Sequence, residues 1–305
     1  MFEAINDYSY LAGNIGLEET INALDSELPG FDAFLTGWIK LLEDQRNIKV
    51  SRLLREAVVL KGGVTAISVL ARQHADKYPL AYLDWIKALR EEGEADSIID
   101  VAREGLVAIP KDYRVRAEIA EVISRMGEEL NDDDLKLEGY RESFHSNPSI
   151  NYLLDLYVTA IECDCFKAVR DQAEQRLWEL FKQDREPVCS YYHAELSRAY
   201  LSEGVLYRSL VLGGRYAELF ELCKGKGSLG WSGGNNPKPF FIILIMVLLS
   251  NEGKHSNIIH KQWNNLLAGS VYEIDNIQAN KYKKIIAVTS RYIQLTEEQE
   301  ALYLK

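Results

Sequence analysis

The chain repeats itself between GGVTAISVLARQHADKYP (Gly62–Pro79) and GEADSIIDVAREGLVAIP (Gly93–Pro110). In both stretches the proline follows the first glycine by seventeen residues, and the two stretches are offset by 31 residues. Aliphatic residues occupy matching positions, such as Ile67 and Ile98. Glycine allows a tight turn, small residues let two helices pack closely, and proline ends a helix. The pattern predicts pairs of antiparallel helices in which the second helix runs to its proline.

The same spacing continues downstream with less regularity. Three further turns are predicted, and the residues that open them are Gly127, Cys163 and Gly214. The acidic run after Gly127 predicts a helix that is capped at Asp134 and extends to Pro148. Residues 48–224 are therefore predicted to hold five helix-turn-helix units.

Apolar residues recur at three- and four-residue steps through nearly the whole chain, which is typical of amphipathic helices. Convincing runs of strict alternation, the mark of strands, are missing from the sequence. We therefore expect an all-α fold. Its predicted parts are an N-terminal helical cap with two helices around Pro29–Gly30 (residues 1–47), an α-solenoid (48–224), a Gly-rich loop (225–239) and a C-terminal helical module (240–305).

Residues 48–184, and more loosely 188–224, resemble tetratricopeptide repeats. The resemblance is carried by the turn glycine Gly93, by Ile98 five residues later and by Pro110 seventeen residues later. The first helix departs from the family, which usually has Trp, Leu, Gly and Tyr there, whereas this chain has Tyr82, Trp85, Ile86 and Leu89. The resemblance implies a superhelical stack whose concave wall is built from the first helix of each unit.

A second resemblance concerns residues 141–157 and 229–249, which are similar to helical regions of bacterial proteins that also carry a SWIM-type zinc finger. Thiolate and imidazole groups for zinc are present at Cys163, Cys165, Cys189 and His193. That finger ends in C-x-H, however, whereas three residues separate Cys189 from His193. The sequence therefore favours buried or turn cysteines and predicts no metal.

The charge of the chain is −11, and its computed pI is near 5.1. A net negative charge disfavours general binding to nucleic acid. Four cysteines in 305 residues fit a reducing compartment. The N-terminus has Glu3 and Asp7 where a signal peptide needs basic residues, and the apolar run 240–249 is shorter than the roughly 20 residues of a membrane span. These features predict a soluble cytoplasmic protein without a membrane segment.

The search for motifs of catalysis or cofactor binding gives no support to the hypothesis that the protein is an enzyme. Gly225–Gly230 has the form G-x-G-x-x-G, but an amphipathic helix is expected before it, where a dinucleotide site needs a strand. No H-E-x-x-H motif occurs in the chain, and no nucleophile elbow is expected. We therefore predict no cofactor and no catalytic residue.

The predicted function is a non-catalytic helical scaffold that binds a protein or peptide partner through its concave groove. The groove is expected to mix both signs of charge with apolar patches, which suits such a partner. With the turn glycines setting the register, the predicted groove residues are Arg52, Glu56, Leu83, Lys87, Arg90, Glu121, Arg125, Leu153, Tyr157 and Arg208.

Two alternatives remain open at this point. The first is a nucleic-acid-associated accessory protein that acts through a mildly basic C-terminal part, at Lys281, Lys283, Lys284 and Arg291. The second is an all-helical enzyme that uses residues 225–239 as a lid. The partner and the oligomeric state are not specified by the sequence.

Overall fold

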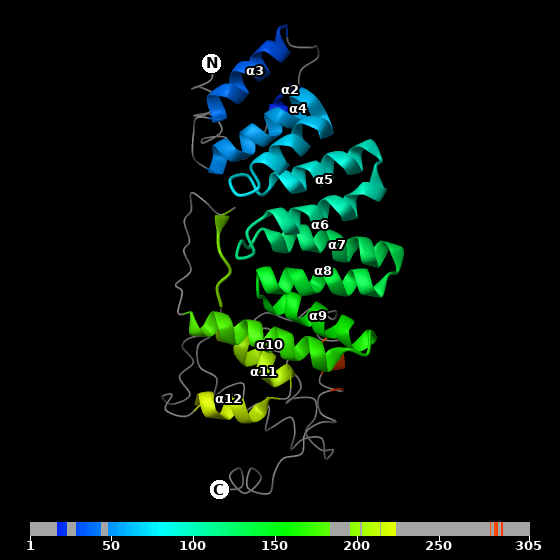
Figure 1. Ribbon diagram of the computed structural model, residues 1–305, viewed down its shortest axis with the longest axis vertical. Helices are drawn as coiled ribbons and strands as arrows, with labels where there is room; N and C mark the ends of the chain where they lie inside the picture. The colour runs from blue at the N-terminus through cyan, green and yellow to red at the C-terminus, as the bar shows by residue number, and fades with distance from the viewer. Residues whose placement is uncertain are drawn as a thin grey trace, which may run out of the picture. The chain divides into compact units, whose positions relative to one another are not determined.

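The computed structural model describes residues 17–22, 29–43, 48–183, 196–201, 203–213 and 215–223, together with Lys281, Lys284, Ile285 and Val288 (Figure 1). Within these residues the regular elements are helices, apart from one isolated antiparallel bridge between Tyr113 and Arg198. The all-α prediction is therefore confirmed for the described part of the chain. None of the helices in these ranges is long and apolar enough to cross a membrane, and the run 240–249 lies outside them.

The chain divides into two compact units, and the division falls inside the range predicted as one repeat array. Unit 1 comprises Met1–Glu129 with Pro187–Ala199, and unit 2 comprises Leu130–Glu186 with Tyr200–Lys305. The helices of unit 1 are α2 (Leu17–Asn22), α3 (Phe31–Glu43), α4 (Ile48–Gln73), α5 (Ala81–Glu92), a short 3-10 turn (Ala95–Ser97), α6 (Ile98–Ala108) and α7 (Arg116–Leu130). Those of unit 2 are α8 (Asp133–Ser146), α9 (Ile150–Glu162), α10 (Phe166–Lys182), α11 (Glu203–Leu212) and α12 (Tyr216–Cys223).

Helix α4 is two helical arms separated by a break at Gly62 and Gly63. Gly62 has φ −145° and ψ 16°, and Gly63 has φ 55° and ψ −146°, so neither continues the helical path. Within unit 1, the two arms of α4 and then α5, α6 and α7 run back and forth in turn (Figure 1). The turn predicted at Gly62 is therefore present.

Gly93 ends α5 in the left-handed conformation that a side chain would strain. Its φ is 80°, and its amide donates to the carbonyl of Arg90, while the amide of Glu94 donates to the carbonyl of Leu89 at 2.9 Å. These bonds close the helix with the pattern of a Schellman cap. The predicted turn between α5 and α6 therefore lies at this glycine.

As predicted, α6 and α8 each end two residues before a proline, Pro110 and Pro148, but the second arm of α4 does not run to Pro79. The second arm of α4 stops at Gln73, and residues 74–80 form a turn in which the amide of Tyr78 donates to the carbonyl of His74 at 2.7 Å. Pro79 therefore lies two residues before Ala81, the first residue of α5.

The turn predicted at Gly127 was also misplaced, because this glycine is buried inside α7. The chain turns four residues later, at Asn131, which has φ 54°. Asp132, rather than the predicted Asp134, caps α8 by accepting a 2.9 Å hydrogen bond from the amide of Leu135. The acidic run therefore caps the helix as expected, but from a position two residues earlier.

Helices α5 and α6 pack closely because Gly105 has no side chain. A Cβ atom at this position would lie 3.0 Å from Cγ and Cδ1 of Tyr82, whose side chain is fully buried. Ala102, one turn earlier on α6, is also fully buried. The small residues of the second helix thus admit the aromatic ring of the first.

A polar cluster ties the second arm of α4 to α5 and α6. Arg72 donates to both carboxylate oxygens of Glu104, at 2.8 and 2.9 Å, and its guanidinium lies 4.6 Å from the ring centroid of Trp85. The hydroxyl of Tyr82 donates to the same carboxylate at 3.2 Å. Burial, followed by the charge of Glu104, raises the pKa of Tyr82 to about 12. The cluster joins the second helices of two successive pairs.

The core of unit 2 is a cluster of apolar side chains from α8 to α12. It includes Phe144 of α8, Leu153 and Tyr157 of α9, and Leu177 of α10, all 2% exposed or less. Ile285, far along the chain, belongs to the same cluster. Unit 2 therefore buries a residue of the predicted C-terminal module in its own core.

Replacement of Gly105 by leucine should destabilise unit 1 by about 1–3 kcal/mol, because the new side chain overlaps the ring of Tyr82. Urea unfolding followed by circular dichroism measures this change. Val107→Leu is the matched control, because Val107 lies on the same helix and is 88% exposed. Equal stability of the two variants would contradict the close approach of α5 and α6.

Candidate functional site

A cleft of about 450 Å³ lies in unit 1 between the first arm of α4 and α5, with α2 at its edge. We call it the α4–α5 cleft. The two helices present stripes at three- and four-residue spacing, as a helix face requires. Its lining residues are Glu18 of α2, Arg52, Arg55, Glu56, Val59 and Leu60 of α4, and Asp84, Lys87, Ala88 and Glu91 of α5.

Arg55 lies at the floor of the cleft and is held there by two partners. Its side chain is 6% exposed, and its Nε lies 2.5 Å from Oδ2 of Asp84. Nη1 donates to the hydroxyl of Ser51 at 2.7 Å. A buried guanidinium with a carboxylate partner and a further acceptor is held in one geometry, because losing the carboxylate would leave its charge uncompensated and losing the hydroxyl would leave a donor unsatisfied. The pair thus fixes α4 against α5.

Glu56, also on α4, is hydrogen-bonded to α2. Its Oε1 accepts a 2.8 Å hydrogen bond from the amide of Glu18, and its Oε2 is buried without a hydrogen-bond partner within the described residues. Nearer to solvent, Lys87 and Glu91 form an ion pair at 3.6 Å, with both side chains more than 60% exposed. The cleft therefore combines an ion pair at its floor, a buried carboxylate oxygen and an exposed charged rim.

Three of the predicted groove residues, Arg52, Glu56 and Lys87, meet in this cleft. Leu83 is half-buried and Arg90 exposed on α5, but neither lines it. On α7, Glu121 and Arg125 form an ion pair with each other one turn apart.

The prediction was wrong for Leu153 and Tyr157, which are fully buried in the core of unit 2. The hydroxyl of Tyr157 forms a 3.1 Å hydrogen bond with that of Ser209, so α11 covers this side of α9. Arg208 is half-buried on α11.

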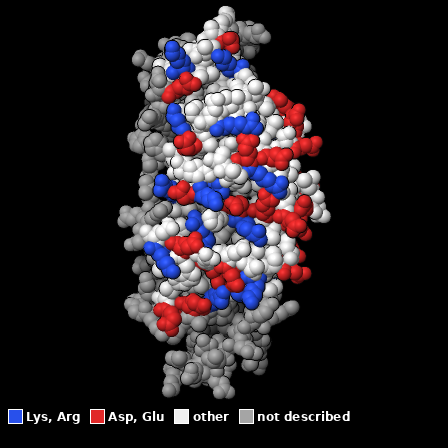
Figure 2. Space-filling model, in the orientation of Figure 1, with Lys and Arg blue, Asp and Glu red and all other residues white. Residues whose placement is uncertain are grey.

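Sequence reasoning missed most of the cleft lining, although a signal for it existed. Extending the Arg52 and Glu56 stripe by steps of three and four reaches Arg55, Val59 and Leu60. The same steps from Lys87 reach Asp84, Ala88 and Glu91. Figure 2 shows Lys and Arg mixed with Asp and Glu over the visible face of the molecule, in keeping with the mixed charges of the cleft.

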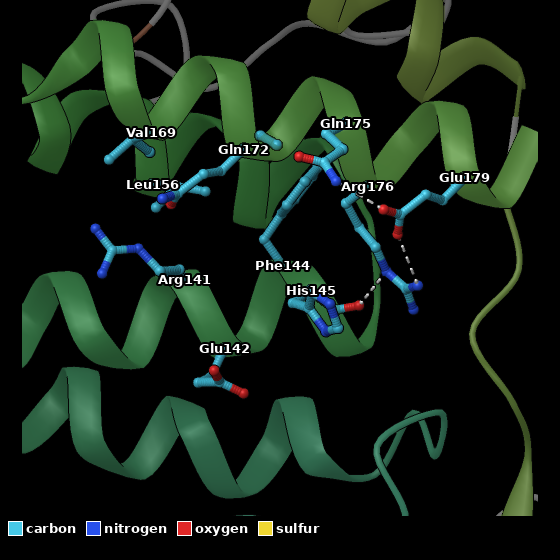
Figure 3. A pocket seen from close by; sticks show the side chains of 11 residues that line it. Arg141, Glu142, Phe144, His145, Leu156, Val169, Gln172, Gln175, Arg176 and Glu179 are labelled. Carbon is cyan, nitrogen blue, oxygen red and sulfur yellow. Dashed lines mark hydrogen bonds and ion pairs between the residues drawn. The ribbon is translucent and has the colours of Figure 1, made fainter.

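A second cavity, of about 260 Å³, lies in unit 2 between α8 and α10 (Figure 3). Its apolar lining comes from Phe144, Leu156, Val169 and Ala173. At its rim, Nε of Arg176 donates to the backbone carbonyl of His145 at 3.1 Å, and Nε2 of Gln175 donates to Glu179 at 3.0 Å. The bond from Arg176 to His145 links α10 to the end of α8, whereas the bond from Gln175 to Glu179 lies within α10.

Behind this cavity, α10 carries a buried carboxylate at Glu174. Its Oε2 accepts from Nε of Arg215 at 2.9 Å, and Arg215 also donates to Asp171 at 2.8 Å. Arg170 lies beside them and donates to the carbonyl of Gly213 at 3.1 Å. Burial raises the pKa of Glu174 to about 7, although the hydrogen bond from Arg215 and the nearby positive charges act in the opposite direction.

The structure describes two of the four basic residues on which the nucleic-acid alternative relies, Lys281 and Lys284. Lys281 pairs with Asp155, and Lys284 donates to Oε1 of Glu162 at 2.6 Å, so both charges are matched by carboxylates of α9. Lys283 and Arg291 lie outside the described residues.

Two of the four possible zinc ligands lie within the described residues. Cys163 and Cys165 are half-buried free thiols at the turn between α9 and α10, whereas Cys189 and His193 lie outside the described residues. The same holds for residues 225–239. Among the residues that are described, no group of three or more His, Cys, Asp or Glu side chains is placed to hold a metal ion.

Comparison of the chain with protein-family models, with curated proteins and with solved structures found no match.

Replacement of Glu174 by glutamine should remove a pH dependence of stability. A carboxyl whose pKa is raised from 4.5 in the unfolded chain to about 7 holds its proton more tightly in the folded state, so stability falls as pH rises from 4.5 to 7. Between pH 5 and pH 8 the wild-type chain should lose up to about 3 kcal/mol relative to the variant.

Chemical denaturation at the two pH values measures this difference. Glu179→Gln is the control, because Glu179 lies on the same helix with its side chain 48% exposed. If Glu174→Gln and Glu179→Gln follow the same pH profile, the carboxyl of Glu174 is not responsible.

Proposed function

We propose that residues 48–224 are a solenoid of tetratricopeptide-like helical pairs and that the protein is a non-catalytic scaffold, which binds a protein or peptide partner through the first helices of its pairs. The proposal includes a location in the cytoplasm, a reducing compartment, because the chain has only four cysteines.

The α4–α5 cleft is the observation that carries this proposal. It lies between the first helices of two successive pairs, where the resemblance to tetratricopeptide repeats places a groove. Apolar groups and both signs of charge line it. Such a lining suits a peptide, whose side chains and backbone supply donors, acceptors and apolar contacts together.

The partly buried Arg55–Asp84 pair also supports a binding surface. It fixes the spacing of the two helices before any partner arrives, so binding requires little ordering of the cleft. Lys87 and Glu91, in contrast, form an exposed ion pair. This pair can open so that each of its residues pairs with a charge of a partner instead. A rigid base with an adaptable rim is a suitable arrangement for a binding surface.

Charge reversal at Arg52 and Lys87 should weaken partner binding at least tenfold, because two cations of the cleft become anions (about 1.4 kcal/mol or more). The test is affinity capture from cells of the source organism, followed by titration of the purified partner against the wild-type chain and Arg52→Glu/Lys87→Glu. The control is Arg103→Glu/Lys111→Glu, which changes the charge equally at exposed positions outside the cleft. Circular dichroism checks that the variants fold.

Equal binding by both variants would refute the cleft as the binding surface. Failure of the wild-type chain to retain any partner would refute the scaffold itself.

A further inference from the structure

Four residues from the C-terminal part of the chain dock on unit 2 with the spacing of one helix face. Lys281, Lys284, Ile285 and Val288 are all helical and stand at steps of three, four and seven from the first. We call them the C-terminal stripe. Ile285 is fully buried in the core cluster of unit 2, and Val288 packs against the same cluster.

The receiving surface is the acidic face of α9, which comprises Asp155, Val158 and Glu162. These residues are three and seven positions apart, so they lie on one side of the helix. Asp155 pairs with Lys281, and Glu162 with Lys284. The short red pieces in Figure 1 lie beside the end of α9. The contact therefore sets two cations against two anions around an apolar centre, and Lys136 of α8 also lies 3.7 Å from Glu162.

The two ion pairs of the contact differ in exposure, since the side chains of Lys281 and Asp155 are 30% and 21% exposed. The side chains of Lys284 and Glu162 are 43% and 38% exposed, and ion pairs with such access to water add little binding energy. Buried Ile285 supplies most of the attraction, while the charges set the register. Without the stripe, Asp155 would have no cation within the described residues. A helix with the same charges and apolar residues fits this face equally well.

We propose that the acidic face of α9 is a binding site for a basic amphipathic helix, and that the C-terminal stripe occupies it as a self-ligand that a partner helix of the same chemistry displaces. The partner helix carries lysine or arginine at its first and fourth positions and aliphatic residues at its fifth and eighth. This is the helix-in-groove mode of recognition, with the resident segment as the template. The site goes beyond the proposed function, since it lies in unit 2 and shares no residue with the α4–α5 cleft.

The test is a fluorescent peptide of residues 277–292, titrated by anisotropy against full-length proteins. In Lys281→Glu/Lys284→Glu/Ile285→Asp the resident stripe is disabled, and the peptide should bind this variant at least tenfold more tightly than the wild-type chain. The reason is that a tethered segment competes at high effective concentration. Lys167→Glu/Lys182→Glu, at exposed positions of α10, is the control and should behave as wild type.

The charges are then exchanged. A receptor with Ile285→Asp, Asp155→Lys and Glu162→Lys, which keeps Lys281 and Lys284, should not bind the natural peptide but should bind a peptide with Lys281→Glu and Lys284→Glu. Equal affinity of the natural peptide for the wild-type chain and the disabled variant, or equal affinity of both peptides for the exchanged receptor, would overturn the proposal.

A second measurement covers the case in which the disabled variant unfolds. Asp155→Lys/Glu162→Lys and Lys281→Glu/Lys284→Glu should each lower the melting temperature of the full chain, and combining them should restore it towards the wild-type value. Additive loss in the combined variant would show that the two pairs do not recognise each other.

Discussion

The close approach of α5 and α6 at Gly105 and Tyr82 is the contact on which the arrangement of unit 1 depends. A single amphipathic helix cannot cover its own apolar face, and two helices cover more of it the nearer their axes lie. Here the absence of one Cβ atom lets a fully buried aromatic ring take the space. The bidentate Arg72–Glu104 pair then links this hairpin to the second arm of α4.

The α4–α5 cleft follows from the same packing. The first arm of α4 and α5 each carry a stripe of charged residues that lines the same space. Arg55 and Asp84 bridge these two helices, and the remaining side chains surround an open space. A surface of this kind requires no reaction chemistry to be useful, since it displays donors, acceptors and apolar groups at fixed spacing.

Local patterns in the sequence predicted the helices and the turn at Gly93, because glycine adopts the φ of 80° that this turn needs without strain. Three residues of the cleft were predicted for a similar reason, since a helix face is a local feature. The failures are long-range. Tyr157 was placed in a groove because its spacing on α9 fits, but Ser209 of α11 bonds its hydroxyl from 52 residues away. No local pattern reveals that α11 and Ile285 cover the core around α9. Gly127 misled in another way, as a glycine inside α7 looks in sequence like a turn.

The most direct test of the account compares how fast Lys87 and Lys111 are acetylated, with and without a bound partner. Both side chains are exposed in unit 1, but only Lys87 lines the cleft between the first helices. A partner seated between α4 and α5 slows the modification of Lys87 and leaves that of Lys111 unchanged. Protection of Lys111 with Lys87 still fully reactive would place the partner elsewhere and contradict the account.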